Sequence, residues 1–398
     1  MFALELLEEA RKFMHHMLTK VVEYGGSDLF ITADFPPSIK HQGLMKPFGQ
    51  QPLTAEKTKL FAYSLMNEKQ RNEFETELEC NFAITVPGIS RFRVNVFQQQ
   101  LNIGMVIRTI TAEIPNFQKL KLPESLKHVI MEKRGLVLVV GGTGSGKSTS
   151  LAAMIDYRNE NSAGHIITVE DPVEYVHKHK KSMITHREVG VDSHSWQNAL
   201  KNTLRQAPDV ILIGEIRDTE TMEHAIAFAE TGHLCLGTLH SNNANQTLDR
   251  IINFFPEERR NQLLMDLSSN MKAIISQRLV RTQDGKGRRA AIEIMLNTPL
   301  ISDLILKGEF HELKAIMAKS RELGMQTFDQ ALFELYNQGE ISYEEALRNA
   351  DSTNELRLQI KLKSNRQDNA PAGQATQFSM ITEPKTTDKD AEDQSETE

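Results

Sequence analysis

Residues 136–157 read LVLVVGGTGSGKSTSLAAMIDY, and this stretch decides the fold. An apolar run at 136–140 leads directly into GGTGSGKS at 141–148, and a helix-forming segment follows at 149–157. The order of strand, glycine-rich loop, Lys-Ser and helix is the full G-x-x-x-x-G-K-[ST] pattern in the context that it requires. A chance glycine-rich turn between a strand and a helix is the plain alternative, and the complete order argues against it.

Each part of this loop suits the binding of ATP. Its backbone N–H groups converge on phosphate oxygens, and the dipole of the following helix adds positive potential. The Lys147 ammonium is expected near the β and γ phosphates, and the Ser148 hydroxyl is expected to ligate Mg²⁺. The predicted ATP-binding residues of the loop are Gly141, Gly142, Thr143, Gly144, Ser145, Gly146, Lys147, Ser148 and Thr149.

Further apolar runs recur at 166–169, 210–213 and 234–239, with helical segments between them. Such runs are typical of parallel strands that helices cover on both faces of a sheet. We therefore predict a doubly wound α/β ATPase domain over 131–363. Short amphipathic helices at 327–360 are expected to close its core.

The chain before this domain has a different pattern. Residues 2–23 place apolar side chains on one face of a helix, which Gly25 and Gly26 end. From 29 to 109, runs of alternating polarity such as RFRVNVF at 91–97 predict an antiparallel sheet with helices. We therefore predict an α+β domain over 1–114 and, because of Pro115 and Pro123, a linker over 115–130.

Composition narrows the class of protein. The formal net charge is −7, but residues 364–398 hold eight acidic and three basic side chains, which leaves about −2 elsewhere. This last segment has too few apolar residues to fold and is predicted to be a disordered acidic tail. A nearly neutral remainder weighs against nucleic-acid binding, which usually needs an excess of Lys and Arg. With two cysteines and no membrane-spanning stretch, the chain is expected in the cytoplasm.

Carboxylates follow two of the predicted strands. Glu215 comes just after the 210–213 strand, where P-loop proteins place an acid near the metal, so we assign Glu215 and Ser148 to Mg²⁺. An Asp is usual there, and a surface acid is the alternative. Glu170 and Glu174 follow the 166–169 strand, and one of them is the expected base for the attacking water. The residues alone do not choose between these two.

Histidines and arginines supply further candidates. His233 and His240 bracket the 234–239 strand, which separates them by roughly 23 Å when extended. Because ligands bind beyond the carboxyl ends of parallel strands, His240 is the better γ-phosphate sensor. His233 better suits a structural or subunit-contact role, although we keep it among the candidate nucleotide-binding residues. Arg91, Arg93 and Arg108 could act as arginine fingers across a subunit boundary, and a solvated or ion-paired surface is their plain alternative.

Four ordered motifs resemble the secretion-type hexameric ATPases, and within them the type IV pilus retraction ATPases of the PilT and PilU group. The motifs are GGTGSGKS at 141–148, ITVEDPVE at 167–174, VILIGE at 210–215 and GHLCLGTLH at 232–240. The resemblance implies a PAS-like N-terminal domain, a RecA-like ATPase domain and a homohexamer with ATP between subunits. It also implies Glu174 as the base, Glu215 near the metal, His240 near the γ-phosphate, and Arg93 and Arg108 completing the site.

One departure places the chain nearer to the PilU branch. PilT-like chains carry an AIRNLIRE segment, whereas residues 299–309 here read PLISDLILKGE, without either arginine. The implied role is therefore to drive or assist pilus retraction beside a PilT-like ring, at an inner-membrane platform protein and without insertion into the membrane. A nucleic-acid translocase and an interaction protein that uses ATP only to hold a ring together are the alternatives.

Overall fold

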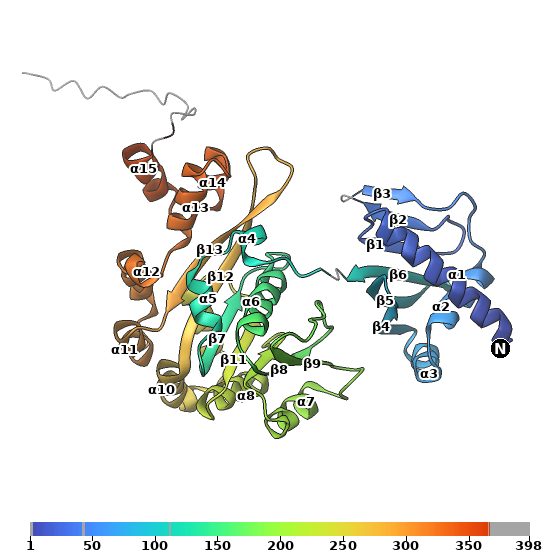
Figure 1. Cartoon of the computed structure of the whole chain (residues 1–398), viewed down its shortest axis with the longest axis horizontal. Coiled ribbons are helices and arrows are strands. Elements are labelled where there is room, and N and C mark those ends of the chain that lie inside the picture. Colours follow the sequence, from blue (N-terminus) through green and yellow to red (C-terminus); the bar gives the residue numbers. More distant parts are fainter. Residues whose placement is uncertain (1–2, 42–43, 111–112, 365, 367–398) are drawn as a thin grey trace, which may run out of the picture.

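The computed structural model describes residues 3–41, 44–110, 113–364 and 366. Two bodies follow one another along the chain, an N-terminal one drawn in blue and a larger one that runs from green to red (Figure 1). The acidic tail predicted over 364–398 lies outside the described residues, apart from Ser364 and Arg366.

The N-terminal body is an antiparallel sheet with helices, as the alternating pattern predicted. Its strands lie in the order β3-β2-β1-β6-β5-β4. In β5, Phe92, Val94 and Val96 are fully buried and Arg93 is exposed, so alternation places one face of the strand in the core. The elements are α1 (Leu4–Glu23), β1 (Asp28–Ile31), β2 (Ser38–His41), β3 (Leu44–Pro47), α2 (Ala55–Leu65), α3 (Glu68–Glu77), β4 (Glu79–Val86), β5 (Ser90–Gln99) and β6 (Asn102–Ile110).

The predicted first helix is confirmed as α1. It buries Met14, Leu18 and Val21, which recur at helical spacing, and it ends just before Gly25. Gly25 has a φ of 67°, in the left-handed region that glycine adopts most easily.

The second body is a seven-stranded sheet in the order β13-β12-β7-β11-β10-β8-β9, in which only β13 is antiparallel to its neighbour. The four predicted strands are all present, and the doubly wound fold is confirmed. Three strands were not predicted, because they mix polar and apolar residues. The strands are β7 (Gly135–Val140), β8 (Gly164–Glu170), β9 (Ser182–Glu188), β10 (Val210–Ile213), β11 (Leu234–Leu239), β12 (Met271–Arg281) and β13 (Arg288–Leu296).

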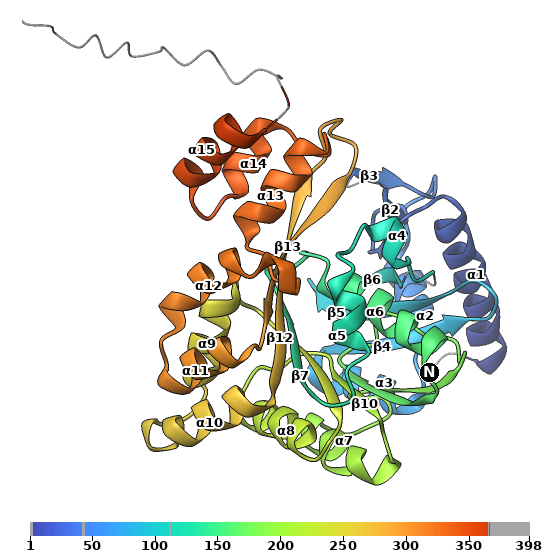
Figure 2. The same ribbon diagram turned by 60° about the vertical axis from the view of Figure 1, so that its left-hand side comes forward.

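Helices cover both faces of this sheet and extend beyond its β13 edge (Figure 2). The C-terminal helices α13, α14 and α15 form the predicted closing cluster, in which Phe328, Leu332 and Leu356 are fully buried. The helices are α6 (Lys147–Asn161), α7 (Trp196–Thr203), α8 (Thr219–Glu230), α9 (Ala244–Ile252), α10 (Arg260–Asn270), α11 (Pro299–Lys307), α12 (Leu313–Lys319), α13 (Phe328–Asn337), α14 (Tyr343–Asn349) and α15 (Thr353–Lys363). None of the helices that the structure describes combines the length and apolar character needed to cross a bilayer.

The segment 115–130, expected as a linker, is built differently. It contains α4 (Phe117–Leu120) and α5 (Ser125–Ile130), and Leu126 and Ile130 are fully buried among side chains of the second sheet. Its apolar residues therefore extend the core of the second body. Pro115 and Pro123 each lie just before one of these two short helices.

Glu293 on β13 makes the free energy of unfolding depend on pH. Its Oε1 accepts hydrogen bonds from the backbone N–H of Ala244, at the start of α9, at 2.8 Å and from Ser276 Oγ at 3.1 Å. Burial raises the pKa of Glu293 to about 7, against the lowering effect of these two bonds. The folded protein therefore holds a proton that the unfolded chain, with a carboxyl pKa of about 4.5, releases.

This linkage predicts that the free energy of unfolding falls as pH rises from about 4.5 to about 7, and that the loss is complete above that range. Replacing Glu293 with Gln should remove on the order of 1–3 kcal/mol of this loss. Urea unfolding of both proteins at pH 5 and pH 8 measures it. An unchanged difference between the two pH values in the variant would show that Glu293 is not the titrating group.

Candidate active site

The glycine-rich loop joins β7 to α6 at the carboxyl end of the sheet. Gly146 has a φ of 89° and occupies the N-cap position of α6. A side chain at Gly141 would place its Cβ 2.5 Å from both the Gln277 carbonyl oxygen and Ser145 Oγ. Lys147 Nζ donates to the carbonyl oxygens of Gly141 at 2.8 Å and Gly142 at 3.1 Å. The loop is therefore tightly wound, with the ammonium group folded over it.

The loop opens onto a cavity of about 460 Å³ into which the other predicted motifs also project. Parallel strands β7, β11, β10 and β8 are neighbours, so the residues that follow them meet at one edge of the sheet. The structure thereby brings together residues separated by almost a hundred positions. The lining includes Thr143, Gly144, Ser145, Gly146, Lys147, Ser148, Thr149, Glu170, Asp171, Glu174, Glu215 and His240.

Glu215 lies between two basic side chains. One of its oxygens, Oε2, accepts from Arg217 Nε at 2.7 Å, and Oε1 lies 3.1 Å from His240 Nε2. The pKa of His240 is lowered, first by burial and then by the Lys147 ammonium, which outweigh the raising effect of Glu215. Ser148 and Glu215 supply the hard oxygen ligands that Mg²⁺ prefers, so the donor set fits this ion.

Glu174 lies on the acidic loop, which we define as residues 171–177. Three hydrogen bonds hold this loop in place. They run from the Val173 N–H to Glu188 Oε2 at 3.1 Å, between Tyr175 Oη and Thr149 Oγ1 at 3.0 Å, and from the His177 N–H to His186 Nε2 at 3.0 Å. The Glu174 side chain is exposed and, among the described residues, has no hydrogen-bond or ion-pair partner.

Glu170, the other candidate base, is more confined. Its side chain is 13% exposed and lies 3.9 Å from His186 Nδ1. Burial lowers the pKa of Lys147, and the negative charges of Glu215 and Glu174 work against that shift. Because Glu174 is exposed and Glu170 is largely buried, Glu174 has the carboxylate that is freer to move. The charge of Glu174 also acts on the Lys147 ammonium.

The arginines of the N-terminal body face this loop. Arg93 and Arg108 line a hollow of about 230 Å³ together with Pro172, Val173 and Glu174 of the same chain. Arg108 Nε also donates to Asp28 Oδ1 at 2.7 Å. Arg93 and Arg108 thus reach the acidic loop from their own chain.

His233 is not brought to the cavity. Its carbonyl oxygen accepts from Gly135 N–H at 3.0 Å, at the start of β7, and its Nδ1 lies 3.2 Å from the Phe228 carbonyl oxygen. It therefore lies at the opposite end of β11 from His240, as the length of this strand requires. The structural role agrees with this position, and the nucleotide-binding assignment within one chain does not.

Gln277 on β12 supports the loop and was not predicted. Its side chain is buried, with Nε2 donating to the Ser145 carbonyl oxygen at 2.8 Å and Oε1 accepting from Ser150 Oγ at 2.8 Å. Leu279 and Arg288 of the β12–β13 hairpin also line the cavity, as does Trp196. No local motif marks Gln277, Leu279 or Arg288, since the pairing of β12 with β7 brings their hairpin here. Trp196 comes separately, from the start of α7.

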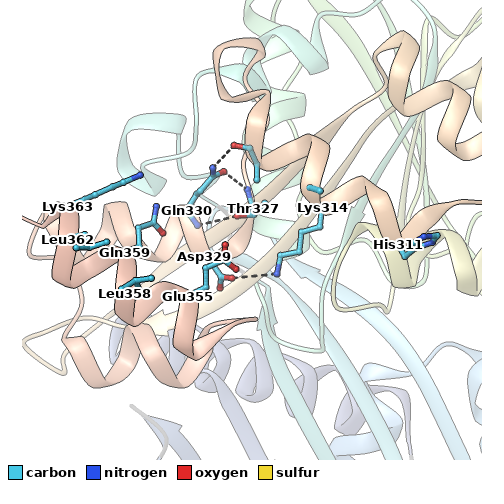
Figure 3. Close-up of a pocket in the computed structure, with 12 residues that line it drawn as sticks. His311, Lys314, Thr327, Asp329, Gln330, Glu355, Leu358, Gln359, Leu362 and Lys363 are labelled. Atoms are coloured by element: carbon cyan, nitrogen blue, oxygen red, sulfur yellow. Dashed lines mark hydrogen bonds and ion pairs between the residues drawn. The ribbon is translucent and has the colours of Figure 1, made fainter. Parts of the chain in front are cut away.

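A roomier hollow of about 610 Å³ lies among the C-terminal helices (Figure 3). Lys314 faces Asp329 across it at 3.5 Å, and Leu358 and Leu362 of α15 form one wall. None of the residues lining it belongs to the four motifs. It is therefore separate from the nucleotide cavity.

A strand, a phosphate-binding loop and a helix on a parallel sheet, with carboxylates at the same edge, define the class of P-loop nucleoside triphosphatases. The comparison with known proteins narrows this class. The chain belongs to the family of type II/IV secretion system proteins, which it matches over residues 5–348. The chain is accordingly an ATPase, as the glycine-rich loop predicted.

Three relatives illustrate the match. The type IV pilus ATPase PilU of Pseudomonas aeruginosa is 62% identical over 348 residues, covering 87% of this chain and 91% of the relative. The type IV pilus retraction ATPase PilT of the same organism is 43% identical, covering 84% and 97%. A crystal structure of the pilus retraction motor PilT with bound ADP has a TM-score of 0.81 at 41% identity, covering 87% and 99%.

Proposed function

We propose that this chain is an ATP-hydrolysing subunit of a type IV pilus motor, which drives or assists pilus retraction. The observation that carries the proposal is the identity of 62% with a type IV pilus ATPase over most of both chains. The cavity between the glycine-rich loop and the acidic loop supports it, because a motor needs a site where ATP cleavage is coupled to domain movement.

In this proposal, the predicted site residues have distinct roles in hydrolysis. The loop amides and Lys147 hold the phosphates, and Ser148 and Glu215 hold Mg²⁺, which neutralises charge on the phosphate oxygens when bound. Glu174 orients the attacking water and accepts its proton. His240 lies beside Glu215 and senses the γ-phosphate, while Arg93 and Arg108 approach from the N-terminal domain of the same chain to stabilise negative charge.

The assembly is proposed to be a homohexamer that lies at the cytoplasmic face of the inner membrane and contacts a platform protein there. The missing arginines at 299–309 and the identity with PilU support a role beside a PilT-like ring. The nearly neutral charge of the part before the acidic tail gives the nucleic-acid translocase no support.

A complementation experiment tests this role. In a pilus-bearing bacterium that lacks its own PilU-like gene, the chain should restore most of the lost twitching-zone diameter, and its Lys147→Ala variant at equal expression should not. The same chain should restore nothing where the PilT-like gene is also deleted. Movement without PilT would contradict the assisting role, and no restoration in the first strain would contradict the motor role.

A further inference from the structure

A buried carboxylate connects the two domains at a point next to the proposed base. Glu188 ends β9, and its side chain is only 4% exposed. One oxygen, Oε2, accepts from Arg91 Nη2 of the N-terminal domain at 2.5 Å and from the Val173 N–H of the acidic loop at 3.1 Å. A single carboxylate oxygen therefore contacts both the neighbouring domain and the residue before Glu174.

Glu188 itself is firmly held. It pairs with Glu170 in the register of β8 and β9, its N–H donates to Asp192 Oδ2 at 2.9 Å, and the next residue, Val189, donates its N–H to the Glu170 carbonyl oxygen at 2.9 Å. These bonds fix the Glu188 backbone, so its carboxylate can move only by rotation of the side chain. Loss of the Arg91 ion pair frees that rotation and weakens the contact of Oε2 with the Val173 N–H.

Arg91 occupies a suitable place to report the position of its domain. It lies on β5 opposite Ile110, the last residue of β6 before the chain passes to the second domain. Its side chain is 23% exposed, and its Nε is buried without a hydrogen-bond partner among the described residues. The ion pair is therefore largely shielded from water, so it is stronger than an exposed pair and its loss costs more.

We propose that Glu188 is a positioning residue, and that its bridge to Arg91 makes the placement of Glu174 depend on the orientation of the N-terminal domain. This positioning role rests on the proposed role of Glu174 as the base. When Arg91 and Glu188 are joined, Val173 is fixed and Glu174 points into the cavity. When the domains separate, Val173 loses part of its anchor, and hydrolysis slows without loss of ATP binding.

A double-mutant cycle with Arg91→Ala, Glu188→Gln and the double variant tests the bridge. Each single variant should lower kcat about tenfold, since a small misplacement of a catalytic group has effects of this size or larger, with KM for ATP changed less than about twofold. The double variant should lose no more than either single one. Arg91→Lys should recover part of kcat, because an ammonium group can still pair with Glu188.

Controls separate positioning from general damage to the fold. Arg259→Ala removes an exposed ion pair with Glu223 in the second domain and should leave kcat unchanged. Thermal unfolding identifies variants that are merely unstable, and Arg91→Lys keeps the test valid if Arg91→Ala does not fold. Losses in kcat that add in the double variant, or a main effect on KM, would overturn the bridge.

A second background distinguishes this inference from the proposed function. In Glu174→Gln, adding Arg91→Ala should not slow single-turnover hydrolysis further, because the bridge acts through the missing carboxylate. A further tenfold loss there would overturn the bridge and leave Glu174 as the base. If Glu174→Gln alone kept full activity, the assignment of the base would fail instead, whatever the outcome of the cycle.

Discussion

Replacing Lys147 with Ala should lower kcat for Mg²⁺-dependent ATP hydrolysis by about 10²–10³-fold, the usual cost of removing a charged donor from a developing negative charge. The Lys147 ammonium is the cation that the glycine-rich loop supplies, and it is half-buried at the edge of the cavity. Neither the loop amides nor the more distant Arg93 and Arg108 can take its place at the β and γ phosphates. Phosphate release at saturating ATP measures the loss.

Lys201→Ala is the matched control, because Lys201 is an exposed lysine on α7 outside the cavity lining. It should hydrolyse ATP at the rate of the unaltered protein. Full activity in Lys147→Ala, with the control also active, would mean that ATP is cleaved at another site. The reading of the 141–148 loop would then fail.

The parts of the fold that depend on local pattern were predictable. The strand before the glycine-rich loop and the helix after it follow from adjacent residues, and so do the end of α1 at Gly25 and the short C-terminal helices. The meeting of Glu170, Glu215 and His240 also followed, because the carboxyl ends of parallel strands share one edge of a sheet.

The parts that depend on pairing across the sheet were not predictable. Gln277 reaches Ser145 only because β12 lies beside β7, and β12 has no apolar run that marks it as a buried strand. Glu188 meets Val173 and Arg91 through the position of β9 and of a separate domain. Its spacing in the sequence gives no sign of either contact.

The separation of the two histidines was predictable from the length of one strand. The structure places His233 and His240 at opposite ends of β11, as that length requires. Within one chain, His233 therefore lies outside the cavity that His240 lines. The segment 115–130 was predicted as a linker because it contains two prolines. In the structure, its helices α4 and α5 extend the core of the second body.

Replacing Glu174 with Gln should lower kcat by about 10²–10⁴-fold and leave ATP affinity within a few-fold, because a general base acts mainly in the transition state. The exposed Glu174 carboxylate, free of partners among the described residues, can accept a hydrogen bond from water in the cavity. Gln keeps the shape of the side chain and removes its ability to accept the proton. Single-turnover hydrolysis and binding of a fluorescent ATP analogue separate the two effects.

Glu170→Gln is the decisive comparison, because Glu170 lines the same cavity and was the other candidate for the base. Its carboxylate is largely buried beside His186, so it is less free to reorient toward water. We expect a smaller loss of kcat in Glu170→Gln than in Glu174→Gln. The reverse order would assign the base to Glu170, and the acidic loop would then serve to receive the arginines of the N-terminal domain rather than to activate water.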